Sequence, residues 1–186
     1  MILWLGLGAG LATGLGWSRL RGYPYQSPAL SHIWLVFVGF LPQFFVIYLG
    51  NTRFTTPDWL AALCIVTSQF ILFIFAWVNR HLPGMSILMI GLLLNMAVMV
   101  ANGGFMPINP VTAERLVGAE KIESYQIGSR IGHKDILLPV DDTQLEWLAD
   151  RVLPPVGFPY QVAFSLGDVF IAFGAFWILA HQKTFN

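Results

Sequence analysis

Charged side chains are almost absent from most of this chain, and their absence most strongly constrains its fold. Eight of the ten acidic residues lie between Glu114 and Asp150, and the other two are Asp58 and Asp168. Only 11% of the residues are charged and 56% are hydrophobic, whereas a soluble domain carries about 25% charged residues. Stretches with so little charge have no polar surface to present to water, so lipid is their natural solvent. The sequence therefore predicts an integral membrane protein.

Five apolar stretches are long enough, or nearly so, to cross about 30 Å of hydrocarbon as helices. They cover residues 2–17, 33–50, 59–78, 85–101 and 162–180. We therefore expect an all-α integral membrane protein, with a single domain built as a bundle of about five transmembrane helices. Residues 102–161 are expected to form one long extramembrane loop.

The long loop is the one sizeable polar region, and we expect it to contain two short amphipathic helices. Asn109 and Pro110 suit the N-cap and the first residue of a short helix. Residues 131–138 have the pattern of an extended segment. A second helix is expected to start at Asp141 and to lie on the membrane surface or on the bundle. Its apolar stripe comprises Leu145, Leu148 and Val152.

Basic residues in the short loops set the expected orientation, because lysine and arginine are enriched on the cytoplasmic side. Four of them follow the first, third and fifth stretches and share one side: Arg19, Arg21, Arg80 and Lys183. Arg53 alone lies in a short loop on the other side. This predicts that the N-terminus and the long loop lie outside and that the C-terminus lies inside. The first stretch lacks the basic start of a cleaved signal peptide, so we expect it to be retained.

The first stretch carries two parallel stripes of small residues. At a spacing of four residues, each stripe lines one side of a helix, and without side-chain bulk another backbone can approach closely. One stripe comprises Gly6, Gly10 and Gly14, and the other comprises Gly8, Ala12 and Gly16. The pattern predicts either packing inside the bundle or docking of another subunit.

Asp168 is the only acidic residue within an expected span. A carboxylate in a membrane usually faces the bundle interior and has a partner, which makes Asp168 a candidate proton site. It is equally a candidate counter-ion of a loop arginine such as Arg115 or Arg130. Ser165 lies three residues earlier, which is the spacing of a capping box with aspartate in place of glutamate. This favours a structural role at the start of a helix.

Other polar residues suggest weaker candidate sites. Those inside the spans are Gln43, Gln69 and Asn95. They could line a polar cavity, although hydrogen bonds between helices explain such amides more simply. In the loop, His133, Lys134 and Asp135 offer groups for acid–base chemistry. No nucleophile signature accompanies them, so solvated charges are the simpler interpretation.

Several function classes find no support in the sequence. A net charge of zero gives no basic surface for nucleic acid. Cys64 is the only cysteine, so neither an intramolecular disulfide nor a cysteine metal site can form. Three histidines fall near helix ends without the spacing of a ligand motif: His32, His81 and His181. We therefore expect no metal, no cofactor and no catalytic residue.

Three motifs carry a family resemblance. They are N-G-G-F-M-P from Asn102, D-T-Q-L-E-W-L-A-D from Asp142 and S-L-G-D from Ser165. Through them, residues 95–180 resemble a family of uncharacterised bacterial membrane proteins that is known only as a domain of unknown function. The resemblance implies a location in the bacterial inner membrane and no particular activity.

Taken together, these patterns favour a non-catalytic accessory subunit of a larger bacterial membrane complex, with other membrane subunits and lipids as partners. An electron-transport complex is the first expectation, on general grounds. One alternative is a small transporter or permease that uses Asp168, Asn95 and the kink expected at Pro42. Another is a membrane enzyme that acts on a lipid or a quinone, with the loop as its active site.

Overall fold

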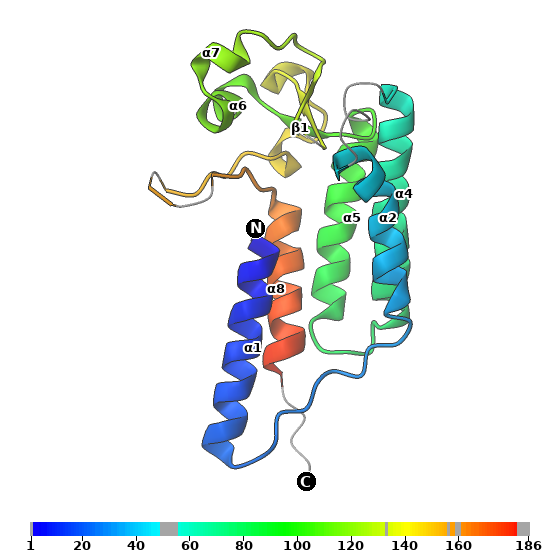
Figure 1. The fold of residues 1–186 in the computed structure, drawn as a ribbon, viewed down its shortest axis with the longest axis vertical. Helices are drawn as coiled ribbons and strands as arrows, with labels where there is room; N and C mark the ends of the chain where they lie inside the picture. Colours follow the sequence, from blue (N-terminus) through cyan, green and yellow to red (C-terminus); the bar gives the residue numbers. More distant parts are fainter. Residues whose placement is uncertain (1, 49–55, 133, 156, 159–160, 182–186) are drawn as a thin grey trace.

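The computed structural model describes residues 2–48, 56–132, 134–155, 157–158 and 161–181. Long helices run side by side, and shorter elements cover one end of them, as Figure 1 shows. The long helices are α1 (Ile2–Arg21), α2 (Trp34–Tyr48), α4 (Asp58–Val78), α5 (Met85–Ala101) and α8 (Leu166–Ala180). The mainly helical architecture is therefore confirmed.

The long apolar helices differ in length. Among the described residues, α4 is the one helix that is both long and apolar enough to cross a membrane. Its 21 residues extend about 32 Å at 1.5 Å per residue. The apolar helices α2 and α8 have 15 residues each, and α5 has 17. The expected stretch 162–180 is too long, because Ser165 caps α8 and Phe164 still pairs with Val152 in a β-bridge.

The helices pack in the order α1, α8, α5, α4 and α2, each against the next. Figure 1 shows α1 at one edge of this arrangement, beside α8. Glycines allow a close approach between α5 and α8. A Cβ atom added to Gly91 would lie 2.5 Å from the Gly167 carbonyl oxygen, and one added to Gly174 would lie 2.6 Å from the Leu88 nitrogen. Even alanine at these positions would push the two backbones apart.

The two small-residue stripes of α1 face different surroundings. A Cβ atom on Gly10 would lie 2.5 Å from the Phe176 carbonyl oxygen, and one on Gly6 would overlap the backbone of Ala172. Gly14, the third residue of this stripe, is buried as well. Gly8 and Gly16 have nothing within 4 Å of an added Cβ atom, and Ala12 is exposed. One stripe therefore packs on α8, and the other faces away from it.

The elements that cover the bundle, hereafter the cap, include a small sheet, so the expectation of an all-α fold is wrong. Its strands are β1 (Met106–Ile108), β2 (Arg130–Ile131) and β3 (Asp135–Leu137). The order is β1-β3-β2, with β1 parallel to β3 and β2 antiparallel to it. The sheet forms because part of the segment expected to be extended pairs with the chain that leaves α5.

Two short helices of the cap lie beside the sheet. They are α6 (Pro110–Val117) and α7 (Ala119–Ile122). Asn109 caps α6, as the sequence predicts, because its side chain accepts a hydrogen bond from the Thr112 backbone N–H at 2.8 Å. Buried side chains of α6, the strands and Ala163 pack together in a core of the cap's own: Ile108, Ala113, Ile131, Leu137 and Ala163.

The second amphipathic helix of the loop does not form. Two 3-10 turns replace it, η1 (Val140–Asp142) and η2 (Glu146–Leu148), and Leu145 between them has a φ of 55°. The buried Asn102 side chain holds this stretch, because it donates to the Gln144 carbonyl oxygen at 2.8 Å and accepts from the Gln144 N–H at 2.9 Å. These bonds fix the backbone outside the helical pattern, while Leu148 enters the core shared with α4 and α5.

Candidate functional site

The start of α8 is held by a reciprocal cap. The Ser165 hydroxyl accepts a hydrogen bond from the Asp168 backbone N–H at 3.1 Å. The Asp168 carboxylate accepts one from the Ser165 N–H at 3.3 Å. This is the capping box that the spacing of the two residues predicts. Asp168 therefore lies in the first turn of α8, where the helix dipole favours its charge.

Asn95 of α5 forms hydrogen bonds with both residues of this capping box. Its side-chain amide donates to Asp168 Oδ1 at 2.8 Å, and its Oδ1 accepts from the Ser165 hydroxyl at 2.8 Å. The bonds require close contact between α5 and α8, and Gly167 permits it, because a Cβ atom there would overlap the Asn95 side chain. Asn95, Ser165 and Asp168 thus form one hydrogen-bonded group on two helices.

The suggested arginine counter-ions of Asp168 are engaged or placed elsewhere. Arg130 forms an ion pair with Asp58 at 2.8 Å and donates to the Thr56 carbonyl oxygen at 2.7 Å. Arg115 lies exposed in the last turn of α6. The basic side chain whose charge acts on Asp168 is Lys134.

Lys134 is the centre of an ion cluster that also contains the half-buried Asp135 and the buried Asp150. Its ammonium nitrogen lies 2.8 Å from Asp150 Oδ2 and 4.0 Å from Asp135 Oδ1. The Asp150 side chain is 1% exposed, and that of Lys134 is 36% exposed. Although burial opposes its charge, the pKa of Lys134 is raised, because the carboxylates of Asp150, Asp135 and Asp168 surround the ammonium group. Lys134 therefore stays protonated.

The single positive charge of Lys134 neutralises the two carboxyl groups of this cluster only in part. Burial raises the pKa of Asp135 to about 7, and it also raises the pKa of Asp150; the charge of Lys134 opposes both shifts only in part. One oxygen of each group, Oδ1, is buried without a hydrogen-bond donor. The charge of Asp150 adds to the rise in the pKa of Asp135. Asp135 therefore takes up a proton more readily than an exposed aspartate does.

The ion pair of Lys134 with the buried Asp150, and the half-buried position of Asp135, correct the interpretation of Lys134 and Asp135 as solvated charges. His133 lies outside the described residues. Sequence reasoning missed the cluster because Asp150, sixteen residues beyond Lys134, offers no local spacing rule. The usable signal was Asp150 at the end of the D-T-Q-L-E-W-L-A-D motif, next to the buried Leu148 and Ala149.

A cavity of about 380 Å³ lies between the bundle and the cap. All five long helices contribute to its lining, which is mainly apolar. The polar side chains in the lining are Gln43, Gln69, Asn95, Lys134 and Asp168. The cavity thus brings together the three amide side chains of the expected spans. It also connects them to the capping box of α8 and to the ion cluster. The Gln69 Oε1 atom is buried without a donor.

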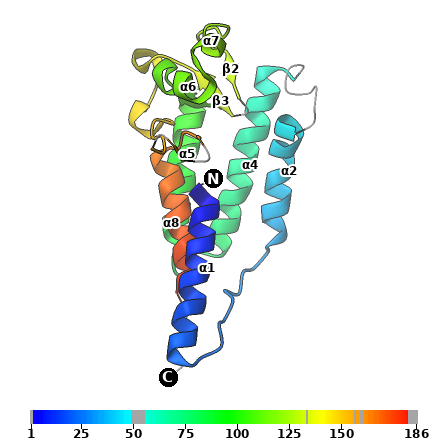
Figure 2. The ribbon, with the colours of Figure 1, turned by 60° about the vertical axis from the view of Figure 1, so that its left-hand side comes forward.

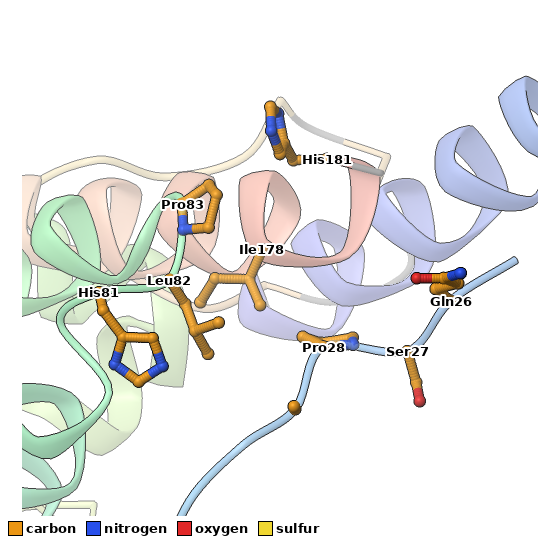
Figure 3. A pocket seen from close by; sticks show the side chains of 9 residues that line it. Gln26, Ser27, Pro28, His81, Leu82, Pro83, Ile178 and His181 are labelled. Atoms are coloured by element: carbon orange, nitrogen blue, oxygen red, sulfur yellow. The ribbon is translucent and has the colours of Figure 1, made fainter. Parts of the chain in front are cut away.

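A second, smaller cavity of about 180 Å³ lies at the other end of the bundle and is lined by His81 and His181. Figure 3 shows that these two imidazoles do not point toward one another. His32 does not line this cavity. Within the part of the chain that the structure describes, no three histidine, cysteine or carboxylate side chains are grouped to hold a metal ion. The cavity between the bundle and the cap, which gathers Asn95, Lys134 and Asp168, is therefore the candidate functional site.

Comparison of the sequence with known protein families identifies the family of the chain. Residues 28–180 match the model of a family of unknown function, DUF5317. The chain belongs to this family. The match begins well before residue 95, where the sequence resemblance begins, and it includes α2 and α4 as well as the ion cluster. No curated protein and no solved structure matches the chain. Membership of DUF5317 brings no activity with it, so the function must be argued from the cavity.

Proposed function

We propose that the chain is a five-helix membrane protein that binds a small amphipathic molecule and serves a larger membrane complex as a non-catalytic accessory subunit. The observation that carries this proposal is the mainly apolar cavity beneath the cap, with Asn95, Lys134 and Asp168 at what we call its polar end. An apolar cavity with a few convergent polar groups is the usual form of a small-molecule site.

The outer surface of the bundle supports its insertion in a membrane. Large apolar side chains are exposed along the long helices, among them Phe37, Phe45, Trp59, Leu63 and Phe173. So many large apolar side chains exposed along helices are unusual on a protein in water. The shorter helices α2, α5 and α8 require local thinning of the bilayer, which costs only fractions of a kcal/mol per Å of mismatch.

The distribution of basic residues supports an orientation with the cap outside. Arg19 and Arg21 lie in the last turn of α1, and Arg80 follows α4. Both helices end away from the cap (Figure 2). Because arginines in short loops favour the cytoplasmic side, the cap and the polar end of the cavity would face the exterior.

The accessory role rests on α1 and on the engaged state of the polar groups. Helix α1 packs mainly on α8, so its second small-residue stripe remains available to another membrane helix. Asp168 already caps α8 and binds Asn95, which favours a structural carboxylate over a transport site. No nucleophile paired with a base accompanies these groups among the described residues, so a binding role suits the cavity better than an enzymatic one.

Affinity purification in a mild detergent tests both parts of the proposal. We expect partner subunits to co-purify with the wild type and to be lost from Ala12→Leu, which adds bulk to the free stripe. We expect a small molecule in extracts of the wild type that is depleted from Leu72→Trp, which fills the cavity. Leu11→Met and Leu63→Ala, at exposed positions outside that stripe and outside the cavity lining, are the matched controls. A protein that purifies alone, with identical extracts from all variants, would contradict the proposal.

A further inference from the structure

We propose that the cavity selects a protonated amine, that is, a molecule with a primary ammonium head and an apolar body. This inference rests on the proposed function, because it names the class of ligand that the same cavity would bind. Three properties of the described side chains lead to it: the sign of the charge, the unmet hydrogen bonds and the apolar lining.

The charge around the polar end of the cavity is negative. Asp135, Asp150 and Asp168 all act on the one ammonium group of Lys134. Even when one of Asp135 and Asp150 is protonated, the four side chains carry one net negative charge. Lys134, the basic side chain in the described lining of the cavity, is already paired with Asp150 at 2.8 Å. Among the described residues, an anionic ligand would therefore meet no unpaired cation there and would meet uncompensated carboxylate charge.

The unmet hydrogen bonds require a donor. Asp168 lines the cavity, and each of its oxygens accepts one bond, from Asn95 and from Ser165. An ionised carboxylate has about four lone-pair sites, so two remain. The Gln69 Oε1 atom, on the same cavity, is buried and accepts none. A quinone carbonyl only accepts hydrogen bonds, whereas an ammonium group donates three.

The rest of the cavity suits an apolar body. Phe40 of α2, Leu72 of α4, Leu92 of α5 and Ile171 of α8 surround it. Burying apolar surface there adds about 25 cal/mol per Å². A bare inorganic cation would gain nothing from these walls, and among the described residues no three carboxylate, histidine or cysteine side chains are grouped for one. The lining therefore favours an organic cation.

Matched probes test the inference on the full chain in phosphatidylcholine nanodiscs. Octylamine, octanol and octanoate share one apolar body and differ in the head group. Their binding is measured by equilibrium dialysis, and binding to empty nanodiscs is subtracted. We expect octylamine to bind about tenfold more tightly than octanol, because a charge-assisted hydrogen bond is stronger than a neutral one. Octanoate should bind most weakly.

Two variants assign the preference to the acceptors of the cavity. Asp168→Asn keeps a side-chain oxygen for the capping box of α8 but removes the charge. It should therefore abolish the tighter binding of octylamine relative to octanol. Asp142→Asn, at an exposed position of the cap, should retain it. If Asp168→Asn does not fold, Gln69→Leu serves instead and should reduce octylamine binding severalfold. Octylamine bound equally by Asp168→Asn and the wild type would contradict the inference.

The outcomes separate this inference from the proposed function. Octanol or octanoate binding as tightly as octylamine would overturn the amine preference while leaving the cavity as a binding site. No specific binding of any probe would overturn both. Repeating the titration with phosphatidylethanolamine in the nanodiscs identifies the source of the amine: competition with octylamine assigns a lipid head group, and its absence assigns a free amphipathic amine.

Discussion

Replacing Lys134 by methionine is the perturbation that most directly tests the ion cluster. Methionine keeps most of the apolar length of the side chain and removes the charge. Asp150, whose side chain is 1% exposed, would lose the ammonium group that lies 2.8 Å from its Oδ2 atom. Asp135 Oδ1, which is buried without a hydrogen-bond donor, would gain no donor from methionine. Breaking a buried ion pair on one side costs about 3–5 kcal/mol.

The expected loss is smaller than that figure, because the Lys134 side chain is 36% exposed and solvent screens part of its interaction. We expect Lys134→Met to lower the free energy of unfolding by about 2–3 kcal/mol at pH 8. For a chain of this length that corresponds to a Tm lower by roughly 4–12 °C. Thermal unfolding in detergent, followed by circular dichroism, measures it.

The dependence of this loss on pH has a definite sign. A raised pKa means that the folded state holds a proton that the unfolded state has released, so stability from Asp135 falls as pH rises from about 4 to about 7. The Lys134 charge moderates that fall, because it lowers the pKa values of Asp135 and Asp150. In Lys134→Met both carboxyl groups can protonate at pH 5, so the loss of Tm should be smaller at pH 5 than at pH 8.

A double-mutant cycle with Asp150→Asn completes the test. If the two side chains interact as the structure shows, the double variant should be more stable than the sum of the single effects predicts, by about 1–2 kcal/mol. A Lys134→Met variant within 0.5 kcal/mol of the wild type at both pH values, as expected for a surface substitution, together with no coupling in the cycle, would refute the ion cluster.

Four further substitutions test other contacts. Gly10→Ala should lower the free energy of unfolding by about 1–3 kcal/mol, because the new methyl group would lie 2.5 Å from the Phe176 backbone. Gly8→Ala should be neutral or stabilising. Chemical denaturation compares the two variants, and equal effects would argue against the packing of α1 on α8. Asn102→Ala should cost about 1–3 kcal/mol and expose the segment of η1 and η2 to limited proteolysis, and an unchanged cleavage pattern would contradict its anchoring role. Ser165→Ala should cost about 1–2 kcal/mol through the lost cap and speed amide exchange in the first turn of α8; unchanged exchange would exclude the cap.

Local rules predicted the elements whose partners lie close in sequence. Ser165 and Asp168 are three residues apart, and Asn109 precedes Pro110, so each cap follows from spacing alone. The four-residue spacing of Gly6 and Gly10 likewise marks one face of α1. These expectations needed no knowledge of the tertiary fold.

Features that depend on distant partners were not predictable in this way. The segment after Asp141 has helical periodicity, but the Asn102 side chain, 42 residues from Gln144, holds it in another conformation. Lys134 was taken as solvated because nothing near it in sequence reveals the buried Asp150. The contact of Gly91 with Gly167 depends on two helices that lie far apart in the chain. In each case tertiary packing overrides the local pattern.

The most direct test of the account is the position of the cap relative to the membrane. In a Cys64→Ser background, single cysteines are placed at Glu120 in α7 and at Arg80 after α4, both exposed. Intact bacterial cells are treated with a membrane-impermeant maleimide, and lysed cells serve as the control. The account predicts labelling of the cysteine at position 120 in intact cells, and of the one at position 80 only after lysis. Labelling of both in intact cells, or the reverse pattern, would contradict a membrane-embedded bundle with an external cap.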